Sequence, residues 1–255
     1  MRPARFTCLL LALLWLPVPL SAQGYTREEY LALIAEYVDK VVNLYDGTWA
    51  YSYTSHDKLD AEALTWRRDP SKPFLESDRL VAVNGLPPEP DRLARHERRM
   101  ERRLRRREEN ARDRSVVEEE QEREGDEKDR FLSLIIPESL QLVKQEGALH
   151  YLEFQGMEED RRTIYEHLVG TLVLDTEQGY IRELQIRVTR PFSNYLVMRI
   201  NSGYFSLRFN LVDGRPVQTD ATWQLDGHIL FVRELDRDEE LEWFDVTPVS
   251  PGTGS

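Results

Sequence analysis

The chain has 255 residues, of which 34 are basic and 46 acidic, so its formal net charge is −12 at pH 7. This negative balance argues against nonspecific binding to nucleic acid or to an anionic membrane. The single cysteine, Cys8, lies in the apolar N-terminal segment, so the rest of the chain has neither disulfides nor thiolate chemistry.

The first 22 residues have the pattern of a secretory signal peptide. Arg2 and Arg5 form a positive n-region, and residues 6–20 form an apolar segment that is too short to span a bilayer as a helix. Small residues at its end predict cleavage between Ala22 and Gln23. We therefore expect an exported chain with 32 basic and 46 acidic residues, a net charge of −14, that is not an integral membrane protein.

An amphipathic helix is predicted at the start of the mature chain. Thr26 can cap it and Glu29 completes a capping box. Apolar residues then recur at helical spacing: Tyr30, Ile34, Tyr37, Val41 and Leu44. We expect the helix to run from Thr26 to Tyr45 and to end at Asp46-Gly47.

Three strands are predicted next, at residues 48–54, 61–68 and 79–83. The first carries Trp49, Tyr51 and Tyr53 on one side, and the second has Trp66 near its end. The dipeptide at 84–85, Asn-Gly, predicts a turn after the third.

Residues 89–128 form a charge dipole. Nine arginines stand against two acidic residues between 92 and 107, whereas ten acidic residues stand against three arginines between 108 and 127. A thin apolar seam at heptad-like spacing (Leu93, Met100, Leu104, Ala111) predicts a solvated helix that lies lightly on the sheet. The acidic half is expected to be looser or disordered.

Two interpretations of the basic half stay open. It can be an arm that docks an anionic lipid, lipopolysaccharide or a partner protein, through Arg98, Arg99, Arg102, Arg103 and Arg106. Alternatively, it is a solvated face whose charge is compensated by the acidic half, which is the commoner use of such segments.

The C-terminal half is predicted to be an antiparallel meander. A strand pair at 140–144 and 149–154 flanks Gly147, and strict apolar/polar alternation follows at 184–188, 196–200, 204–211 and 217–225. Turn signals stand at 177–179, 201–203, 213–214 and 226–227. We expect a mostly β, α+β fold of ten or eleven strands, in which the antiparallel sheet curls into an unclosed half-barrel under two helical lids. It forms one domain over 23–247, and 248–255 is a disordered tail.

Five short segments carry a family resemblance: 81–88 (VAVNGLPP), 170–175 (GTLVLD), 179–186 (GYIRELQI), 190–193 (RPFS) and 201–205 (NSGYF). Together with the signal peptide, the helix and the first strand, they resemble the lipoprotein-carrier superfamily of periplasmic half-barrels, the LolA and LolB type, with the anti-sigma-factor regulator RseB as a relative. The resemblance covers most of the mature chain and implies a periplasmic, eleven-stranded unclosed barrel whose cavity binds acyl chains or hydrophobic peptide. The segment 89–128 is longer than the lid helices of that family.

The sequence contains no pattern typical of catalysis. None of the five histidines stands at a metal-binding spacing from another, and no Gly-x-Ser-x-Gly elbow is present. The acidic clusters at 158–160 and 236–240 lack the ligand loop of an EF-hand. We therefore expect no enzyme activity, no metal and no cofactor.

Two functions remain as hypotheses. The first is a non-enzymatic periplasmic carrier of a lipid, acyl chain or lipoprotein. Its cavity would be lined by seven aromatic residues: Trp49, Tyr51, Tyr53, Trp66, Phe205, Phe209 and Trp223. The alternative is that these residues fill a core, as aromatic residues on the faces of sheets usually do. The second is an envelope scaffold that docks a protein partner through the arginine-rich helix.

Overall fold

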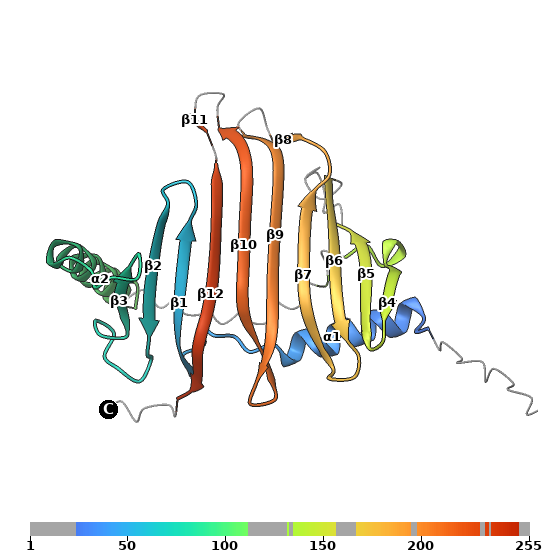
Figure 1. Ribbon diagram of the computed structural model, residues 1–255, viewed down its shortest axis with the longest axis horizontal. Helices are drawn as coiled ribbons and strands as arrows, with labels where there is room; N and C mark the ends of the chain where they lie inside the picture. The colour runs from blue at the N-terminus through green and yellow to red at the C-terminus, as the bar shows by residue number, and fades with distance from the viewer. Residues whose placement is uncertain are drawn as a thin grey trace, which may run out of the picture.

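The computed structural model describes residues 24–111, 132, 135–156, 167–194, 198–229, 233–234 and 236–249. These residues form a mostly β structure around one 12-stranded sheet with only two α-helices (Figure 1). Ten strands follow one another in the order β3-β2-β1-β12-β10-β9-β7-β6-β5-β4, β11 pairs with β10, and β8 pairs with β9. All pairings are antiparallel, and the edge strands β3 and β4 do not meet, so the sheet is not closed.

The strands have the following bounds: β1 Trp49–Asp57, β2 Glu62–Arg68, β3 Asp78–Val83, β4 Gln141–Glu146, β5 Leu149–Gln155, β6 Leu168–Asp175, β7 Tyr180–Val188, β8 Phe192–Asn194, β9 Met198–Val212, β10 Arg215–Ile229, β11 Arg233–Glu234 and β12 Arg237–Pro248. A short 3₁₀ turn, Pro137–Ser139, precedes β4. The three strands predicted after the first helix and the pair around Gly147 are confirmed to within a few residues.

The first helix, α1 (Arg27–Lys40), begins as predicted with a capping box. Glu29 N donates to the Thr26 hydroxyl at 3.2 Å, and Thr26 N donates to the Glu29 carboxylate at 2.7 Å. The helix ends at Lys40, five residues before the predicted end at Tyr45. The chain continues in extended form because Val42 N donates to Pro216 O at 2.9 Å, which ties this segment to the sheet.

The second helix, α2 (Pro90–Ala111), occupies the basic half of the charged segment as predicted. Met100 is its one buried residue among the described side chains, so it lies on the sheet through a narrow contact. Residues 112–131, which include all of the predicted acidic half except its first four residues, lie outside the described residues, as do the predicted signal peptide and residues 250–255. Neither of the two described helices is long and apolar enough to cross a membrane.

Both helices lie on the same face of the sheet, which we call the helix face. The strand register shows this, because one cross-strand row joins the residues under α1 to those near α2: Leu152, Leu172, Leu184, Leu207, Ala221, Leu241, Ser55 and Leu64. Directly opposed residues in neighbouring strands point to the same side of a sheet. The apolar residues that the predicted alternation contributes to this row, Leu184, Leu207 and Ala221, therefore lie on the helix face.

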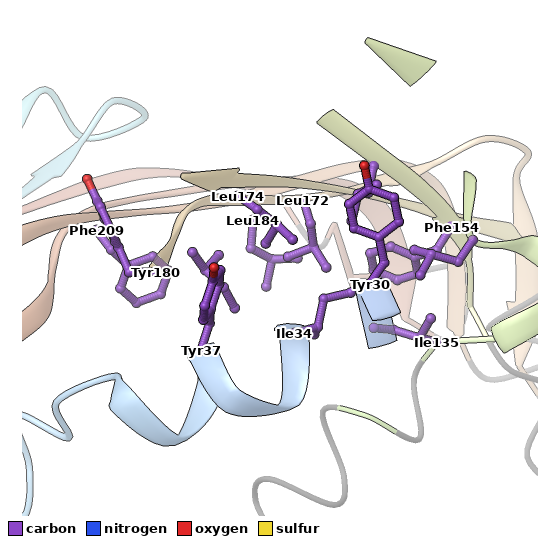
Figure 2. Packing of buried hydrophobic residues seen from close by; sticks show 13 residues of the cluster. Tyr30, Ile34, Tyr37, Ile135, Phe154, Leu172, Leu174, Tyr180, Leu184 and Phe209 are labelled. Carbon is purple, nitrogen blue, oxygen red and sulfur yellow. The ribbon is translucent and has the colours of Figure 1, made fainter. Parts of the chain in front are cut away.

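The α1 part of the helix face is a filled core. Tyr30, Ile34 and Tyr37 of α1 point toward Leu172, Leu174 and Leu184 of the sheet (Figure 2). Ile34, Leu152, Leu172 and Leu174 are fully inaccessible to solvent. A second cluster lies beside it, where the segment after α1 covers β1, β10 and β12: Leu44, Trp49, Tyr51, Val217, Ala221 and Trp243.

Two predicted turns are wrong, since residues 201–203 lie inside β9 and 226–227 inside β10, each of which has 15 residues. The glycines at these positions serve close packing instead of chain reversal. A Cβ on Gly227 would lie 2.3 Å from Arg199 O, and one on Gly203 would lie 2.9 Å from Val188 Cγ2. The Asp213-Gly214 turn is confirmed, with φ angles of 50° and 74°.

The chain stays ordered beyond the predicted start of the tail at 248. Pro248 pairs with Trp49 as the last residue of β12, and Val249 N donates to Thr48 O at 2.8 Å. β12 thus ends one residue past the predicted domain end at 247, and Val249 is hydrogen-bonded to the residue before β1.

Candidate functional site

Three of the seven aromatic residues predicted to line a cavity lie in the core. Trp49 and Tyr51, each 3% exposed, belong to the second cluster, and Phe209, 7% exposed, packs beneath α1. Burial raises the pKa of Tyr51 to about 12, so this phenol is neutral at every physiological pH.

The other four aromatic residues lie on the part of the helix face between α1 and α2. Tyr53 stacks between Trp66 and Trp243, with ring centroids 6.4 Å from each. Further along the face, the rings of Phe205 and Trp223 are 4.1 Å apart. Tyr53, Trp66 and Phe205 are half-buried and Trp223 is 39% exposed, so neither helix covers these residues completely.

A second cross-strand row shows how the helix face changes between the helices. It runs from the α1 side through Phe154, Gly170, Ile186, Phe205, Trp223, Glu239, Asp57 and Glu62. The row is sealed and apolar at Phe154, exposed at Trp223, and acidic toward α2. We call the part of this row between the two helices the central strip. It runs from the aromatic residues Phe205 and Trp223 to the acidic residues Glu239, Asp57 and Glu62.

A cavity of about 220 Å³ lies where the central strip meets α2, and we call it the α2 pocket. Residues of both the sheet and the helix line it: Tyr53, Ser55, Trp66, Asp78, His96, Arg99, Arg103, Glu239 and Leu241. Burial and the nearby Asp78 carboxylate raise the pKa of the Tyr53 phenol, so the Tyr53 hydroxyl is retained as a neutral polar group.

Two polar atoms of the α2 pocket are buried without a hydrogen-bond partner, Asp78 Oδ1 and His96 Nδ1. His96 Nε2 lies 2.9 Å from the Asp78 backbone carbonyl, which only accepts, so Nε2 carries the proton and Nδ1 of the neutral ring is an acceptor. The imidazole is held against the Trp66 ring at 4.9 Å between centroids. The pocket therefore contains two unsatisfied acceptors, which are costly in a buried setting.

The predicted docking arginines divide into two groups. All five are exposed to solvent, but only Arg99 and Arg103 line the α2 pocket. Among the described residues, no acidic side chain lies within ion-pair distance of any of the five.

Arg92 anchors the start of α2 to β2. Its guanidinium donates two hydrogen bonds of 2.6 Å to the two carboxylate oxygens of Glu62. The hydrogen bonds from Arg92 lower the pKa of Glu62 below its ordinary value. Together with Met100 and the His96 hydrogen bond, this pair holds the helix on the sheet.

The carboxylate of Glu239, at the floor of the α2 pocket, is already paired. Ser55 Oγ donates to Glu239 Oε1 at 2.6 Å, and Arg237 contacts the other carboxylate oxygen. Arg237 also lies over the Trp223 ring, 5.3 Å from its centroid. Glu239 is thus neutralised locally, and the charged groups of the pocket that have no ion-pair partner among the described residues are Asp78, Arg99 and Arg103.

A larger cavity of about 670 Å³ lies between the end of α1 and the turns that join β6 to β7 and β9 to β10. These two turns lie at the bottom of the sheet in Figure 1. Trp49 contributes to its wall, but charged and polar groups dominate it, among them Asp39, Lys40, Asp46 and Arg215. It has no continuous apolar surface, so we place the candidate site on the central strip and in the α2 pocket.

Sequence reasoning missed Asp78, His96, Ser55 and Glu239. The helical spacing of Arg92, His96, Arg99 and Arg103 placed these four on one side of α2, which was the available signal. It does not tell which strands lie beneath that side, so Asp78 and the Trp66 ring could not be assigned to the same pocket.

Comparisons with known proteins found no matching family model, no matching curated protein and no matching solved structure. Within the part of the chain that the structure describes, no group of three or more His, Cys, Asp or Glu side chains is arranged to hold a metal ion. The proposed function therefore rests on the site and on the sequence patterns described above.

Proposed function

We propose that the protein is a non-enzymatic binding or carrier protein for a hydrophobic ligand, such as a lipid, an acyl chain or a lipidated protein, exported to the periplasm. The observation that carries this proposal is the incomplete cover of the apolar face at the centre of the sheet. Phe205, Trp223 and Leu225 lie on the helix face, yet Trp223 is 39% exposed and the other two are only half-buried. An exposed aromatic ring that continues into half-buried apolar neighbours on one face supports a binding site there.

In this proposal the ligand lies along the central strip, between α1 and α2. The rings of Phe205 and Trp223 form its floor, and Leu241 continues that floor toward α2. Burying such side chains against an apolar chain is worth roughly 25 cal/mol per Å² of apolar surface removed from water. The binding energy thus comes from completing a face that the two helices leave open.

We propose that α2 is the movable cover of this site, and that α1 is a fixed one. Three buried residues of α1 pack into the core, whereas α2 buries only Met100 and is otherwise held by the Arg92–Glu62 pair and the His96 hydrogen bond. A helix held by few buried contacts opens at low free-energy cost. Its opening admits the ligand and its closure covers one end of the strip.

The test is a titration of the purified chain with a fluorescent fatty acid. Wild-type protein should bind it saturably, and Trp223→Asp should weaken binding at least about tenfold, because a charge replaces the apolar floor. Phe244→Asp is the matched control, since Phe244 is 36% exposed on the adjacent strand β12 but its partner Ser52 places it on the opposite face. Equal loss in both variants, or no saturable binding to wild type, would contradict the proposal.

The scaffold hypothesis is retained as a second candidate, because Arg98, Arg102 and Arg106 are exposed and have no acidic partner among the described residues. In that case the arginines dock a protein or an anionic envelope surface, and the sheet is only a support. Deletion of residues 92–124 separates the two functions. A carrier retains its ligand after the deletion, whereas a scaffold loses its partner and keeps its fold.

A further inference from the structure

The α2 pocket has features that an apolar ligand does not use. Its volume of about 220 Å³ is below the roughly 300–1,000 Å³ of pockets that enclose a whole drug-sized ligand. It adjoins the central strip at Glu239, which belongs to both, and Ser55 and Leu241 lie beside Glu239 on the same face. The pocket therefore has room for one end of a ligand whose apolar part lies on the strip.

The polar groups of the pocket define what this end must supply. Asp78 Oδ1 and His96 Nδ1 are both buried acceptors without a partner, so the ligand must bring at least two hydrogen-bond donors. Neutral hydroxyl groups fit both acceptors, and they also match the Tyr53 hydroxyl, which can donate or accept.

The charges of the pocket add a second requirement. Arg99 and Arg103 stand four residues apart on α2, where like charges repel one another, and neither has an ion-pair partner among the described residues. An anionic group between them converts this repulsion into charge-assisted hydrogen bonds. Glu239 does not compete for them, because Ser55 and Arg237 already hold its carboxylate.

The aromatic wall adds a third requirement. Trp66 and Tyr53 are nearly parallel, with an interplanar angle of 17°, and together they present an apolar surface beside the polar groups. A ring with one face of C–H groups packs on such a surface while its edge hydroxyls reach the acceptors.

We infer that the α2 pocket binds the headgroup of the ligand, and that this headgroup is a single sugar-sized ring bearing hydroxyls and one phosphate or carboxylate. Arg99 and Arg103 bind the anionic group, Asp78 and His96 accept from the hydroxyls, and Trp66 and Tyr53 pack on the ring. This inference rests on the proposed function, because it takes the apolar part of the same molecule to lie on the central strip.

The test compares three probes that share an octyl chain, each used below its critical micelle concentration. Octyl glucuronide carries the hydroxyls and the anion, octyl glucoside has the hydroxyls alone, and octyl phosphate has the anion alone. Free glucuronic acid serves as the headgroup without a chain. We expect wild-type protein to bind octyl glucuronide at least about tenfold more tightly than each of the other three, as the loss of a charge-assisted hydrogen bond or of the chain predicts.

Two variants assign that preference to the pocket. Arg99→Gln with Arg103→Gln should abolish the preference for octyl glucuronide over octyl glucoside, whereas Arg98→Gln with Arg102→Gln, on the same helix but outside the pocket, should preserve it. Asp78→Asn keeps the size of the side chain and should reduce the preference for octyl glucuronide over octyl phosphate.

The outcomes separate the two claims. Equal binding of the three octyl probes overturns the headgroup inference and leaves the apolar carrier function in place. Free glucuronic acid binding as tightly as octyl glucuronide supports the headgroup pocket and overturns the carrier function. Binding of none of the four compounds overturns both.

Discussion

The α1 part and the α2 part of the helix face come from the same alternation of residues, yet they differ in how completely they are covered. Under α1, Leu152, Leu172 and Leu174 are inaccessible to solvent. Beside α2, Tyr53, Trp66 and Trp223 occupy equivalent positions on the same face and remain partly accessible. The strands are alike, so the difference lies in the helices.

The two helices explain the difference through their own residues. Tyr30, Ile34 and Tyr37 recur at a helical spacing and give α1 a buried apolar stripe. On α2 the equivalent stripe contains arginine and histidine around Met100, so the helix touches the sheet through polar groups. An apolar strand face is sealed or left partly open according to the helix that covers it, and four predictions follow from this contrast.

The largest expected effect is at Ile34. Ile34→Ala should lower the free energy of unfolding by about 2–4 kcal/mol, because it leaves a cavity among side chains that cannot collapse around it. Met100→Ala should cost less, about 1–2 kcal/mol, since α2 can shift on its narrow contact. Urea denaturation measures the free energy of unfolding of each variant. An equal loss of stability in Ile34→Ala and Met100→Ala would contradict the proposed distinction between a fixed and a movable helix.

A pair of glycines sharpens the same contrast. A Cβ on Gly170 would lie 2.0 Å from the Phe154 ring, which is 3% exposed and packed in the α1 core. Gly170→Ala should therefore cost about 2–3 kcal/mol through overpacking. Gly203→Ala, whose Cβ would approach half-buried Val188 and Leu225 side chains, should cost less than about 1 kcal/mol because these can rotate away. The urea concentration at the midpoint of unfolding compares the two variants, and a larger loss of stability in Gly203→Ala than in Gly170→Ala would contradict this expectation.

Most of the sheet could be predicted from the sequence because the pattern is local. Alternation identified the strands, Thr26 and Glu29 identified the start of α1, and Asp213-Gly214 identified a turn. The same local rule failed at Gly203 and Gly227, where glycine allows a neighbouring strand to come close inside a long hairpin. A glycine-containing tripeptide in one sequence does not distinguish a turn from such an approach.

The site was less predictable, because its parts come from distant segments. The aromatic residues were found by alternation, but their division into three core residues and four residues of the open area depends on where the helices end. Asp78 and His96 come together only when α2 lies on β2 and β3. That contact is tertiary and leaves no local pattern.

The attachment of α2 should depend on pH. Arg92 lowers the pKa of Glu62 in the folded state, so the pair stabilises the attached helix fully above the ordinary glutamate pKa of about 4.3 and is lost as the pH falls through the lower folded-state value. Amide exchange in α2, corrected for intrinsic rates and referred to β6, should therefore become faster below about pH 4.

Glu62→Gln is the matched control for that measurement. It should make exchange in α2 a few-fold faster at pH 6, as expected for a partly exposed pair worth about 1 kcal/mol, and remove much of the pH dependence. Unchanged pH dependence in the variant would show that another group controls the attachment of α2.

The smallest effect on stability is expected in the central strip itself. Trp223→Ala and Phe244→Ala should each change the free energy of unfolding by less than about 1 kcal/mol, because both side chains are more than one-third exposed. Trp223→Ala should nevertheless weaken binding of the fluorescent fatty acid, and Phe244→Ala should not. A large loss of stability in Trp223→Ala would show that this residue belongs to the core.

Mass spectrometry of the molecules that co-purify with the chain, combined with titration of the stripped protein, tests the central claim most directly. The account predicts one bound amphiphile per chain, with an apolar chain and an anionic, hydroxylated headgroup, and saturable uptake of octyl glucuronide after its removal. A protein that unfolds cooperatively but neither carries an amphiphile nor takes one up would contradict it.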